Sequence, residues 1–204
     1  MSNTPTTSYP VMEMFYSLQG EGYHQGKAAY FIRLAGCDVG CVWCDVKDSW
    51  DALKHPVLSV DTIVKNALAH PSRLAIITGG EPLLHCLDPL TDALKAAGFE
   101  TNIETSGSSP MSGTWDWICL SPKKFKAPLP ENVQLAAELK VVVFHKTDFE
   151  WAETYAKQVL PTCKLYLQPE WDKQATITPL VIEYVKANPK WELSAQLHKY
   201  IQVP

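Results

Sequence analysis

Three cysteines lie within nine residues, Gly36-Cys37-Asp38-Val39-Gly40-Cys41-Val42-Trp43-Cys44, at the spacing C-x3-C-x2-C. Thiolates are the usual ligands of iron–sulfur clusters, and a cubane cluster takes four of them. Three adjacent cysteines with no evident fourth leave one iron open to a non-protein ligand. Because an open iron can bind and reduce a small molecule, this segment predicts a catalytic cluster rather than an electron carrier.

Two other readings of this segment stay open at this point. Buried cysteines often serve as small hydrophobic residues, and three cysteines can also form part of a zinc site that a distant histidine completes. Structural zinc sites usually carry a second C-x2-C or H-x3-H unit further along the chain. The remaining cysteines stand isolated and are expected in the core: Cys86, Cys119 and Cys163. The spacing therefore favours a cluster held by Cys37, Cys41 and Cys44.

A second motif, Thr78-Gly79-Gly80-Glu81-Pro82, follows the apolar run Leu74-Ala75-Ile76-Ile77. The apolar run predicts a buried parallel strand. Two glycines at its end allow the backbone to approach a ligand closely, and the Glu81 carboxylate can accept hydrogen bonds from a cationic amino group. The alternative is an ordinary β-turn that closes the strand.

The order of elements predicts an α/β fold, because strand-like and helix-like segments alternate with short loops. Strands are expected at 29–34, 74–78, 100–104, 117–120, 139–144, 164–168 and 191–195. Helices are expected at 60–68, 88–97, 148–159 and 179–187. Ser59 is a good N-cap for the first helix and Gly98 a good terminator of the second. We expect residues 1–204 to form one domain, and 128–130 to be a short loop rather than a linker.

Polar residues follow several of these strands, and in parallel sheets ligands bind at the carboxyl ends of the strands. These polar stretches are 78–81, 104–106, 121–123 and residue 168. Taken singly, each is also explained by capping and loop hydrogen bonds. Together they predict one rim that carries the functional side chains.

Composition sets limits on partners and location. The chain of 204 residues has 46% hydrophobic and 20% charged residues, which are values typical of a globular protein. A net charge of -4 gives no electrostatic footprint for nucleic acid. Residues 1–7 are polar and lack the apolar region of a signal peptide, and no run approaches the ~20 apolar residues of a membrane span. We therefore expect a reducing, cytoplasmic location with no membrane or nucleic-acid partner.

The cysteine spacing, with the glycine turn about 40 residues further on, resembles the radical S-adenosylmethionine (SAM) superfamily. In that superfamily the cysteine loop holds a [4Fe-4S] cluster, and SAM chelates the fourth iron. This resemblance implies an iron–sulfur cluster and SAM as cofactors.

A more specific resemblance, to the 7-carboxy-7-deazaguanine synthase family, extends over nearly the whole chain. It rests on the segments 13–22, 31–37, 41–45, 76–82, 103–107, 121–123, 167–169 and 196–200. The discriminating features are Gln19-Gly20-Glu21-Gly22 and the closing His198-Lys199-Tyr200. The resemblance implies a partial, open TIM-like barrel of the radical SAM type. It also implies conversion of 6-carboxy-5,6,7,8-tetrahydropterin to 7-carboxy-7-deazaguanine, with loss of ammonia, by a 5'-deoxyadenosyl radical made from SAM.

The same resemblance implies roles for individual residues. Those expected to contact the cofactor are Trp43, Cys44, Asp45, Gly80, Glu81, Glu104, Ser106, Ser121, Pro122, Lys123 and Gln168. Those expected to contact the substrate are Leu18, Gln19, Gly20, Glu21, Arg33, Thr78, His198 and Pro204. The Arg33 guanidinium, just before the cysteine loop, suits bidentate binding of a carboxylate. No side chain is expected to act as a nucleophile.

One position departs from the family pattern. A threonine usually follows the Cys-Asp pair, and its hydroxyl is a magnesium ligand that helps to hold the substrate carboxylate. This chain has Val46 followed by Lys47, and valine offers no oxygen to a hard cation. Either Mg2+ is held by substrate and water, with help from Asp45 or Ser49, or a cation such as Lys47 takes its place.

The resemblance further implies a homodimer and a reduced flavodoxin or ferredoxin as the electron donor. Two rival functions stay open on the residues alone. A non-catalytic iron–sulfur or zinc protein needs the cysteine loop but neither Gly80-Glu81 nor Arg33. A radical SAM activating enzyme for a glycyl-radical protein shares the loop and the turn, but is not expected to match Gln19–Gly22.

Overall fold

One curved sheet runs through residues 7–204, the part of the chain that the computed structural model describes. Its order is β3-β1-β2-β4-β5-β6-β7-β8-β9. The strands are β1 (Ser8–Leu18), β2 (Ala28–Leu34), β3 (Val57–Ser59), β4 (Leu74–Gly79), β5 (Glu100–Thr105), β6 (Trp117–Leu120), β7 (Glu138–Val143), β8 (Lys164–Pro169) and β9 (Trp191–Leu193).

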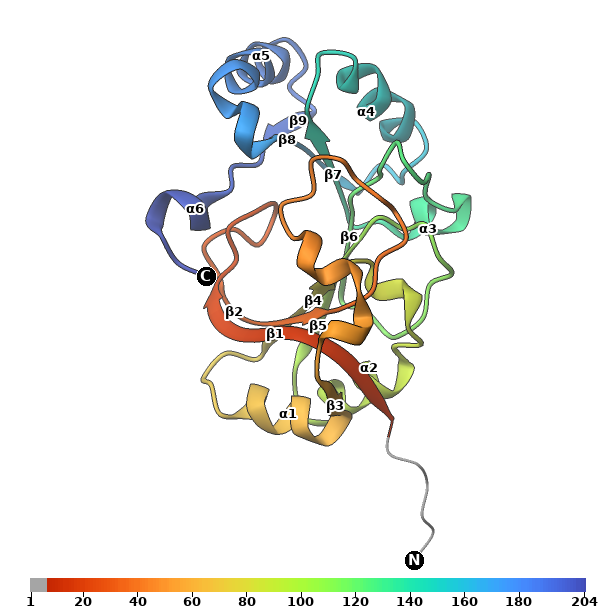
Figure 1. Cartoon of the computed structure of the whole chain (residues 1–204). Helices are drawn as coiled ribbons and strands as arrows, with labels where there is room; N and C mark the ends of the chain where they lie inside the picture. Colours follow the sequence, from red (N-terminus) through yellow and green to blue (C-terminus); the bar gives the residue numbers. More distant parts are fainter. Residues whose placement is uncertain (1–6) are drawn as a thin grey trace, which may run out of the picture.

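The sheet is mostly parallel and does not close. Strands β2 and β4 to β9 run parallel to one another, whereas β1 pairs antiparallel with β2 and with β3. Among the described strands, β3 and β9 each pair with one neighbour and form the two edges. The result is a partial TIM-like barrel, which confirms the predicted α/β class (Figure 1).

Helices cover the outer, convex side of the sheet (Figure 1). They are α1 (Val60–Leu68), α2 (Asp88–Ala96), α3 (Pro130–Leu135), α4 (Asp148–Ala156) and α5 (Gln174–Ala187). The short helix α6 (Leu197–Ile201) lies apart from them, near the C-terminus (Figure 1). Single 3-10 turns lie at Lys47–Trp50, Ala52–Lys54, Pro82–Leu84 and Trp171–Lys173. No helix in the described part of the chain has both the length and the apolar character needed to cross a bilayer.

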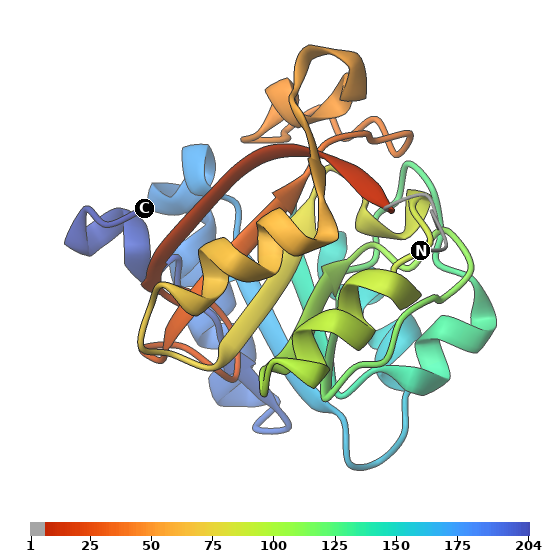
Figure 2. The same ribbon diagram turned by 90° about the horizontal axis from the view of Figure 1, so that it is seen from below.

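Alternation along the strands gives the sheet an apolar outer face and an inner face that carries both polar and apolar side chains. In β2, Ile32 and Leu34 point outward and pack with residues of α1 and α2, which lie side by side over the strands in Figure 2. Phe31 and Arg33, which alternate with them along the strand, point to the inside of the barrel. In β7, Leu139 and its outward-facing neighbours belong to a second core under α4 and α5. The inner face is therefore free to carry the site.

The predicted strands and helices are present, with ends that shift by a few residues at 139–144, 148–159 and 191–195. The capping prediction is confirmed, because Ser59 accepts a hydrogen bond from the Thr62 amide. Gly98, which follows α2, has a φ of 82°.

Other expectations were wrong. Helix α5 begins at Gln174 rather than at 179, and Pro179 lies inside it. Proline has no backbone N–H, so one hydrogen bond of the helix is missing there. Ile177 and Val181 are buried on either side of it, and their packing sustains the helix. The expected loop at 128–130 leads directly into α3, which has Pro130 in its first turn. Strands β1 and β3 and helices α3 and α6 were not predicted.

We predict that Ser59→Ala lowers the midpoint of thermal unfolding by about 2–4 °C, because loss of an N-cap costs about 1 kcal/mol. Differential scanning fluorimetry of the anaerobic protein measures this shift. Lys65→Ala, on the exposed side of the same helix, is the matched control and should leave the midpoint nearly unchanged. An equal drop in both variants would mean that the cap is not the cause.

Candidate active site

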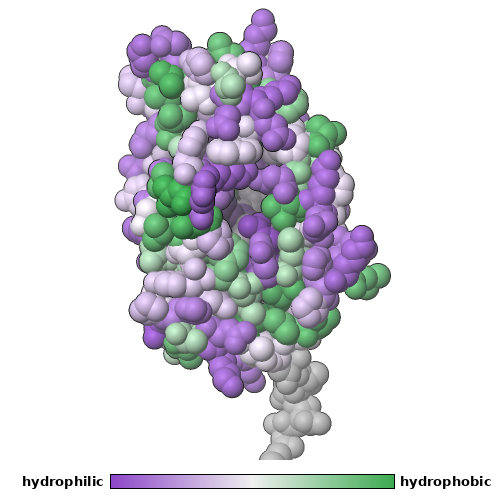
Figure 3. All heavy atoms as spheres, turned by 60° about the vertical axis from the view of Figure 1, so that its left-hand side comes forward, coloured by the Kyte–Doolittle hydropathy of each residue, from purple (hydrophilic) through white to green (hydrophobic). Residues whose placement is uncertain are grey.

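A cavity of about 290 Å³ opens at the carboxyl ends of the parallel strands. The space-filling view shows a hollow with hydrophilic side chains around its mouth (Figure 3). Of the predicted site residues, those that line the cavity are Leu18, Gln19, Gly20, Glu21, Arg33, Cys37, Cys41, Trp43, Cys44, Asp45, Thr78, Gly80, Glu81, Glu104, Ser106, Ser121, Lys123, Gln168, His198 and Pro204. Pro122 is buried but is absent from the cavity wall. The single-rim prediction is otherwise confirmed.

The cysteine loop leaves the end of β2 and forms one side of this cavity. Cys41 is buried, Cys37 and Cys44 are partly exposed, and all three thiols are free. Burial raises the pKa of Cys37, and it raises the pKa of Cys41 to about 11. Metal binding requires thiolates, so loading such a site releases protons.

The three thiols line one cavity, as ligands of a single cluster would. Within residues 7–204, no group of three or more His, Cys, Asp or Glu side chains is gathered closely enough to hold one ion. Cys119 and Cys163 are buried in the core as expected, whereas Cys86 is exposed, so its predicted core position was wrong.

The glycine turn at the end of β4 touches the cysteine loop directly. The Gly80 amide donates to the Leu34 carbonyl at 3.1 Å, and the Glu81 amide donates to the Gly36 carbonyl at 2.8 Å. A Cβ on Gly79 would lie 2.2 Å from the Leu34 oxygen, and one on Gly80 would lie 2.4 Å from the Gly36 oxygen. Only glycine therefore fits at both positions, and the two motifs form one backbone unit.

Glu81 is buried behind this turn and joins β4 to β5. Its carboxylate accepts hydrogen bonds from the Thr105 hydroxyl (2.5 Å), the Ser106 amide (2.8 Å), the Ser106 hydroxyl (2.5 Å) and the Leu83 amide (3.1 Å). These four donors match the four acceptor positions of a carboxylate. A ligand amine at Glu81 would therefore have to share oxygens that the protein already engages.

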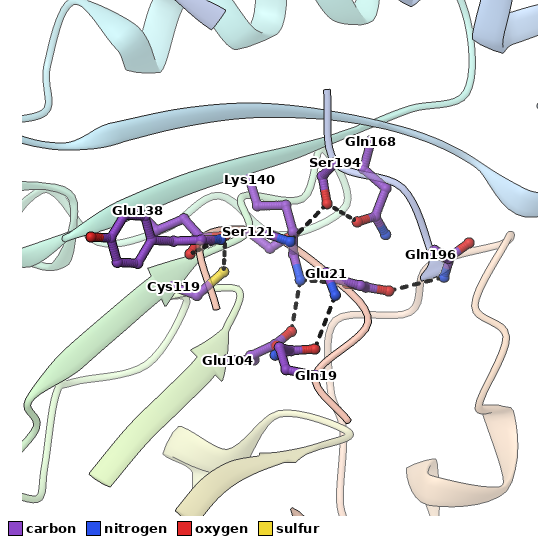
Figure 4. Close-up of polar contacts among 12 residues, drawn as sticks. Gln19, Glu21, Glu104, Cys119, Ser121, Glu138, Lys140, Gln168, Ser194 and Gln196 are labelled. Carbon is purple, nitrogen blue, oxygen red and sulfur yellow. Dashed lines mark hydrogen bonds and ion pairs between the residues drawn. The ribbon is translucent and has the colours of Figure 1, made fainter. Parts of the chain in front are cut away.

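A buried ion network lies on the inner face of β7 (Figure 4). The Lys140 ammonium is 2.5 Å from a Glu21 oxygen and 2.8 Å from a Glu104 oxygen. The Gln19 amide donates to the other Glu104 oxygen at 2.7 Å, and the Gln196 amide donates to the other Glu21 oxygen at 3.1 Å. Each carboxylate is thus held at both oxygens.

The pKa values of this network follow from burial and pairing. Burial raises the pKa of Glu21, but the charge of Lys140 and its hydrogen bond outweigh this and hold that pKa at about 2. Burial lowers the pKa of Lys140, yet the surrounding acidic groups, including Glu104 and Glu21, raise it well above its ordinary value. Glu138, two residues earlier on β7, has its pKa raised by burial.

The loop Gln19–Gly22 is fixed by the C-terminal segment and by β7. A Cβ on Gly20 would lie 2.1 Å from a His198 ring atom, and one on Gly22 would lie 1.9 Å from a Glu138 oxygen. The Leu197 amide donates to the Gly20 carbonyl at 2.9 Å. The loop therefore occupies a slot that admits only glycine at these two positions.

Arg33 and Asp45 sit at the mouth of the cavity, each with one ionic partner. The Arg33 Nε donates to a Glu13 oxygen at 2.6 Å, across the β1–β2 pair. This contact orients the guanidinium while it uses the Nε edge alone. The Asp45 carboxylate accepts from Lys199 at 3.0 Å, which links the cysteine loop to α6.

Lys123 and Trp43 form the wall beside the cysteine loop. The Lys123 ammonium is 2.5 Å from the Ser121 hydroxyl and 5.4 Å from the centre of the Trp43 ring. Burial lowers the pKa of Lys123, and the neighbouring Cys41 counteracts this.

The residues around the departure from the family pattern are also placed. Val46 lines the cavity, but Lys47 is exposed and absent from its wall. Ser49 is buried, and its hydroxyl donates to the Val46 carbonyl at 2.7 Å. Ser49 is therefore not positioned to supply an oxygen to Mg2+, and Lys47 is not positioned to take the place of the ion.

Several residues of the wall were not predicted: Lys140, Glu170, Trp171, Asp172 and Gln196. Lys140 had a signal in the sequence, because it interrupts an otherwise apolar strand at Leu139–Val143. A charged residue at a position that faces the inside of a barrel is unusual without a partner. For Gln196 no pattern in the sequence pointed to the cavity.

Comparisons with known proteins agree with this geometry. Residues 31–145 match the Radical SAM superfamily model. The chain is 52% identical to the 7-carboxy-7-deazaguanine synthase of Flavobacterium psychrophilum, over 96% of this chain and 92% of that protein. It is 45% identical to the synthase of the same name from Synechocystis sp., over 100% and 97% of the two chains.

A solved structure agrees as well. The crystal structure of QueE from Escherichia coli superposes with a TM-score of 0.82 at 35% identity, over 94% of this chain and 95% of that one. Fold, motif order and full-length identity therefore coincide. The chain belongs to the 7-carboxy-7-deazaguanine synthase family of the radical SAM superfamily.

Proposed function

We propose that this chain converts 6-carboxy-5,6,7,8-tetrahydropterin to 7-carboxy-7-deazaguanine with loss of ammonia, as a radical SAM enzyme of queuosine biosynthesis. The observation that carries this proposal is a single cavity whose wall combines the cysteine loop, the glycine turn and the Gln19–Glu21 loop. A protein that only transfers electrons needs no substrate-sized cavity beside its cluster. The family membership supports the same reaction.

The residues present fit an iron–sulfur cluster and SAM. Cys37, Cys41 and Cys44 would hold three irons of a [4Fe-4S] cluster, and Gly80, which has no side chain, allows the glycine turn to pack directly against Gly36 and Cys37 of the loop that carries them. When bound, cluster and SAM supply the organic radical that starts the reaction. The proposed SAM wall is Trp43, Cys44, Asp45, Gly80, Glu81, Glu104, Ser106, Ser121, Pro122, Lys123 and Gln168, of which Pro122 would act from outside the cavity.

The opposite wall would hold the substrate. Arg33 would bind the substrate carboxylate through its terminal nitrogens, since its Nε is engaged by Glu13. The segment Leu18–Glu21 would form hydrogen bonds with the edge of the pterin ring. Thr78, His198 and Pro204 would make further contacts. These groups bind, orient and keep water away from reactive species, and no side chain attacks the substrate.

A protein-held magnesium ion does not fit the wall at Val46. The side chain there is apolar, and Asp45 is engaged by Lys199. We propose that any Mg2+ in this site relies on oxygens of the substrate and water.

The remaining features of the proposal rest on the family and on the chemistry of the site. They are a single domain over residues 1–204, a homodimer, a reduced flavodoxin or ferredoxin as electron donor, and a reducing cytoplasm. An open-iron cluster must be reduced by one electron and kept from oxidation, which supports the last two.

Anaerobic reconstitution with SAM, dithionite and the carboxytetrahydropterin tests the function, with products identified by mass spectrometry. We expect 7-carboxy-7-deazaguanine together with the SAM cleavage products methionine and 5'-deoxyadenosine. Formation of 5'-deoxyadenosine without the deazaguanine would favour an activating enzyme that awaits a protein partner. Absence of both would favour a non-catalytic iron–sulfur protein.

We predict that Cys37→Ala, Cys41→Ala or Cys44→Ala abolishes cluster assembly, because each removes one of three thiolate ligands on a single loop. Iron and sulfide content after anaerobic reconstitution measures assembly. Variants of Cys86, Cys119 and Cys163 are the controls and should keep their iron. A Cys163→Ala variant that loses iron as thoroughly as Cys41→Ala would contradict a three-cysteine site.

We predict that Arg33→Lys weakens substrate binding about ten-fold or more and leaves SAM binding unchanged. An ammonium cannot reproduce a bidentate fork, and a hydrogen bond to a charged group is worth about 1.5–3 kcal/mol. Isothermal titration with each ligand separates the two effects. Glu13→Gln keeps the guanidinium and should cost less. Equal losses for substrate and SAM would assign Arg33 to support of the cysteine loop instead.

We predict that Val46→Thr tightens the apparent affinity for Mg2+, because it adds a hydroxyl oxygen to the cavity wall. Initial rates against magnesium concentration in chelator-treated enzyme measure this affinity. Val46→Ala, which changes volume without adding oxygen, is the matched control, and Lys47→Ala should have no effect because Lys47 is exposed. Tightening in Val46→Ala as well would show that space, rather than a ligand oxygen, limits the ion.

A further inference from the structure

Lys140 is the feature of the cavity that the proposed function leaves unexplained. Its side chain is 4% exposed, and it projects from β7 between two carboxylates that come from distant parts of the chain (Figure 4). Burying an ammonium is costly unless ion pairs and hydrogen bonds compensate for its lost hydration. A buried lysine at this position therefore indicates a role that an apolar residue cannot fill.

The network is arranged so that Lys140 immobilises both carboxylates. Each carboxylate has one oxygen on Lys140, while its other oxygen accepts from a glutamine amide, Gln19 for Glu104 and Gln196 for Glu21. A carboxylate has about four acceptor positions, so each still has acceptor capacity. All five residues line the cavity, and this capacity is therefore available to a ligand inside it.

The charge of the network is not balanced. One ammonium faces two carboxylates, which leaves one net negative charge at the buried wall. The other titratable groups that face Lys140 and Glu21 come from β6, β7, the loop after β6, and α6: Cys119, Glu138, Lys123 and His198. Burial raises the pKa of Glu138 and so favours its neutral form. The wall therefore suits a neighbour that offers N–H donors.

The amino-oxo ring of a pterin carries adjacent N–H groups along one edge, and two fixed carboxylates match such an edge. We propose that Lys140 is a positioning residue that acts through Glu21 and Glu104, holding both carboxylates as fixed, charged acceptors for the N–H edge of the pterin. This inference rests on the proposed function, with one change: Glu104, which that proposal places on the SAM wall, is assigned to the substrate because it shares Lys140 with Glu21 and bonds to Gln19. It adds that the wall, and not the ligand, supplies the counter-charge that keeps these acceptors in place.

The test compares Lys140→Met, Lys140→Gln and Lys140→Arg with the wild-type holoenzyme. Binding of 6-carboxy-5,6,7,8-tetrahydropterin is measured without SAM, so that no turnover occurs, from about pH 8 to about pH 6. Iron content, thermal midpoint and SAM binding are recorded for each protein. Lys164→Met, the same change at an exposed position of the neighbouring strand β8, is the matched control.

Lys140→Met should weaken binding about ten-fold or more near pH 8, since each lost charge-assisted contact is worth roughly that factor. The dependence of pterin affinity on pH distinguishes the variants more clearly than the affinity at one pH. In the wild type Glu21 has a pKa of about 2, so it is ionised across the whole range and affinity stays flat. Without Lys140, burial raises the pKa of Glu21. A larger fraction of Glu21 is then neutral at lower pH, so the affinity for the pterin falls as the pH falls.

Lys140→Gln keeps a donor but no charge, and should share the falling profile. Lys140→Arg keeps the charge and should keep the flat one. Lys140→Met binding within about three-fold of wild type with a flat profile overturns the inference, as does a falling profile in Lys140→Arg. Lys164→Met should behave as wild type, and a falling profile in this control would equally overturn it.

If both neutral variants fail to fold, the same claim is tested from the partner side. Glu21→Gln and Glu104→Gln should each weaken pterin binding while iron content and SAM binding stay normal, and unchanged affinity in both overturns the inference. Failure of the inference is distinguishable from failure of the proposed function. A wild-type enzyme that neither binds nor converts the pterin refutes the function. Wild-type turnover, together with unchanged pterin affinity and pH profile in Lys140→Met, refutes only the role of Lys140.

Discussion

The carbonyl oxygens of Leu34 and Gly36 accept hydrogen bonds from the amides of Gly80 and Glu81, and these bonds tie the cysteine loop to the end of the neighbouring strand. The contact is possible because no side chain separates the two backbones. The positions of the side chains around this contact depend on the close approach of the two backbones. Glu81, carried by the same turn, engages Ser106 at the end of β5, so three strand ends are held in one arrangement.

The same sheet carries two opposite environments. Its outer face packs against helices through apolar side chains, and its inner face holds ionic groups away from bulk water. Strand alternation alone produces this division, so Leu139 and Lys140 are neighbours in sequence but lie in different media. Charge can be concentrated inside the barrel without disturbing the core that stabilises it.

Much of this could be predicted from the sequence, because the informative signals are local. The cysteine spacing, the glycine turn and the alternating segments each lie within a short window. The alternation predicted the α/β class, and the two motifs indicated the family whose resemblance implied the partial barrel and many residues of the cavity wall. Strand β1 escaped prediction because it is defined by pairing with β2 and β3, and not by a pattern of its own. Lys140 escaped because its partners lie 119 and 36 residues away. The exposed Cys86 shows the converse, since residue type alone does not determine burial.

The wall opposite the cysteine loop joins the two ends of the described chain. Gln196 bonds to Glu21 across 175 residues, and Ser194 bonds to Gly22 across 172. Contacts of such separation form late, because the loop they close is nearly the whole chain. During synthesis the cysteine loop and the glycine turn emerge long before the segment that completes the cavity. A growing chain therefore has its cluster ligands before it has an enclosed site, and the chamber for a reactive radical is completed only when the last strand and α6 are in place.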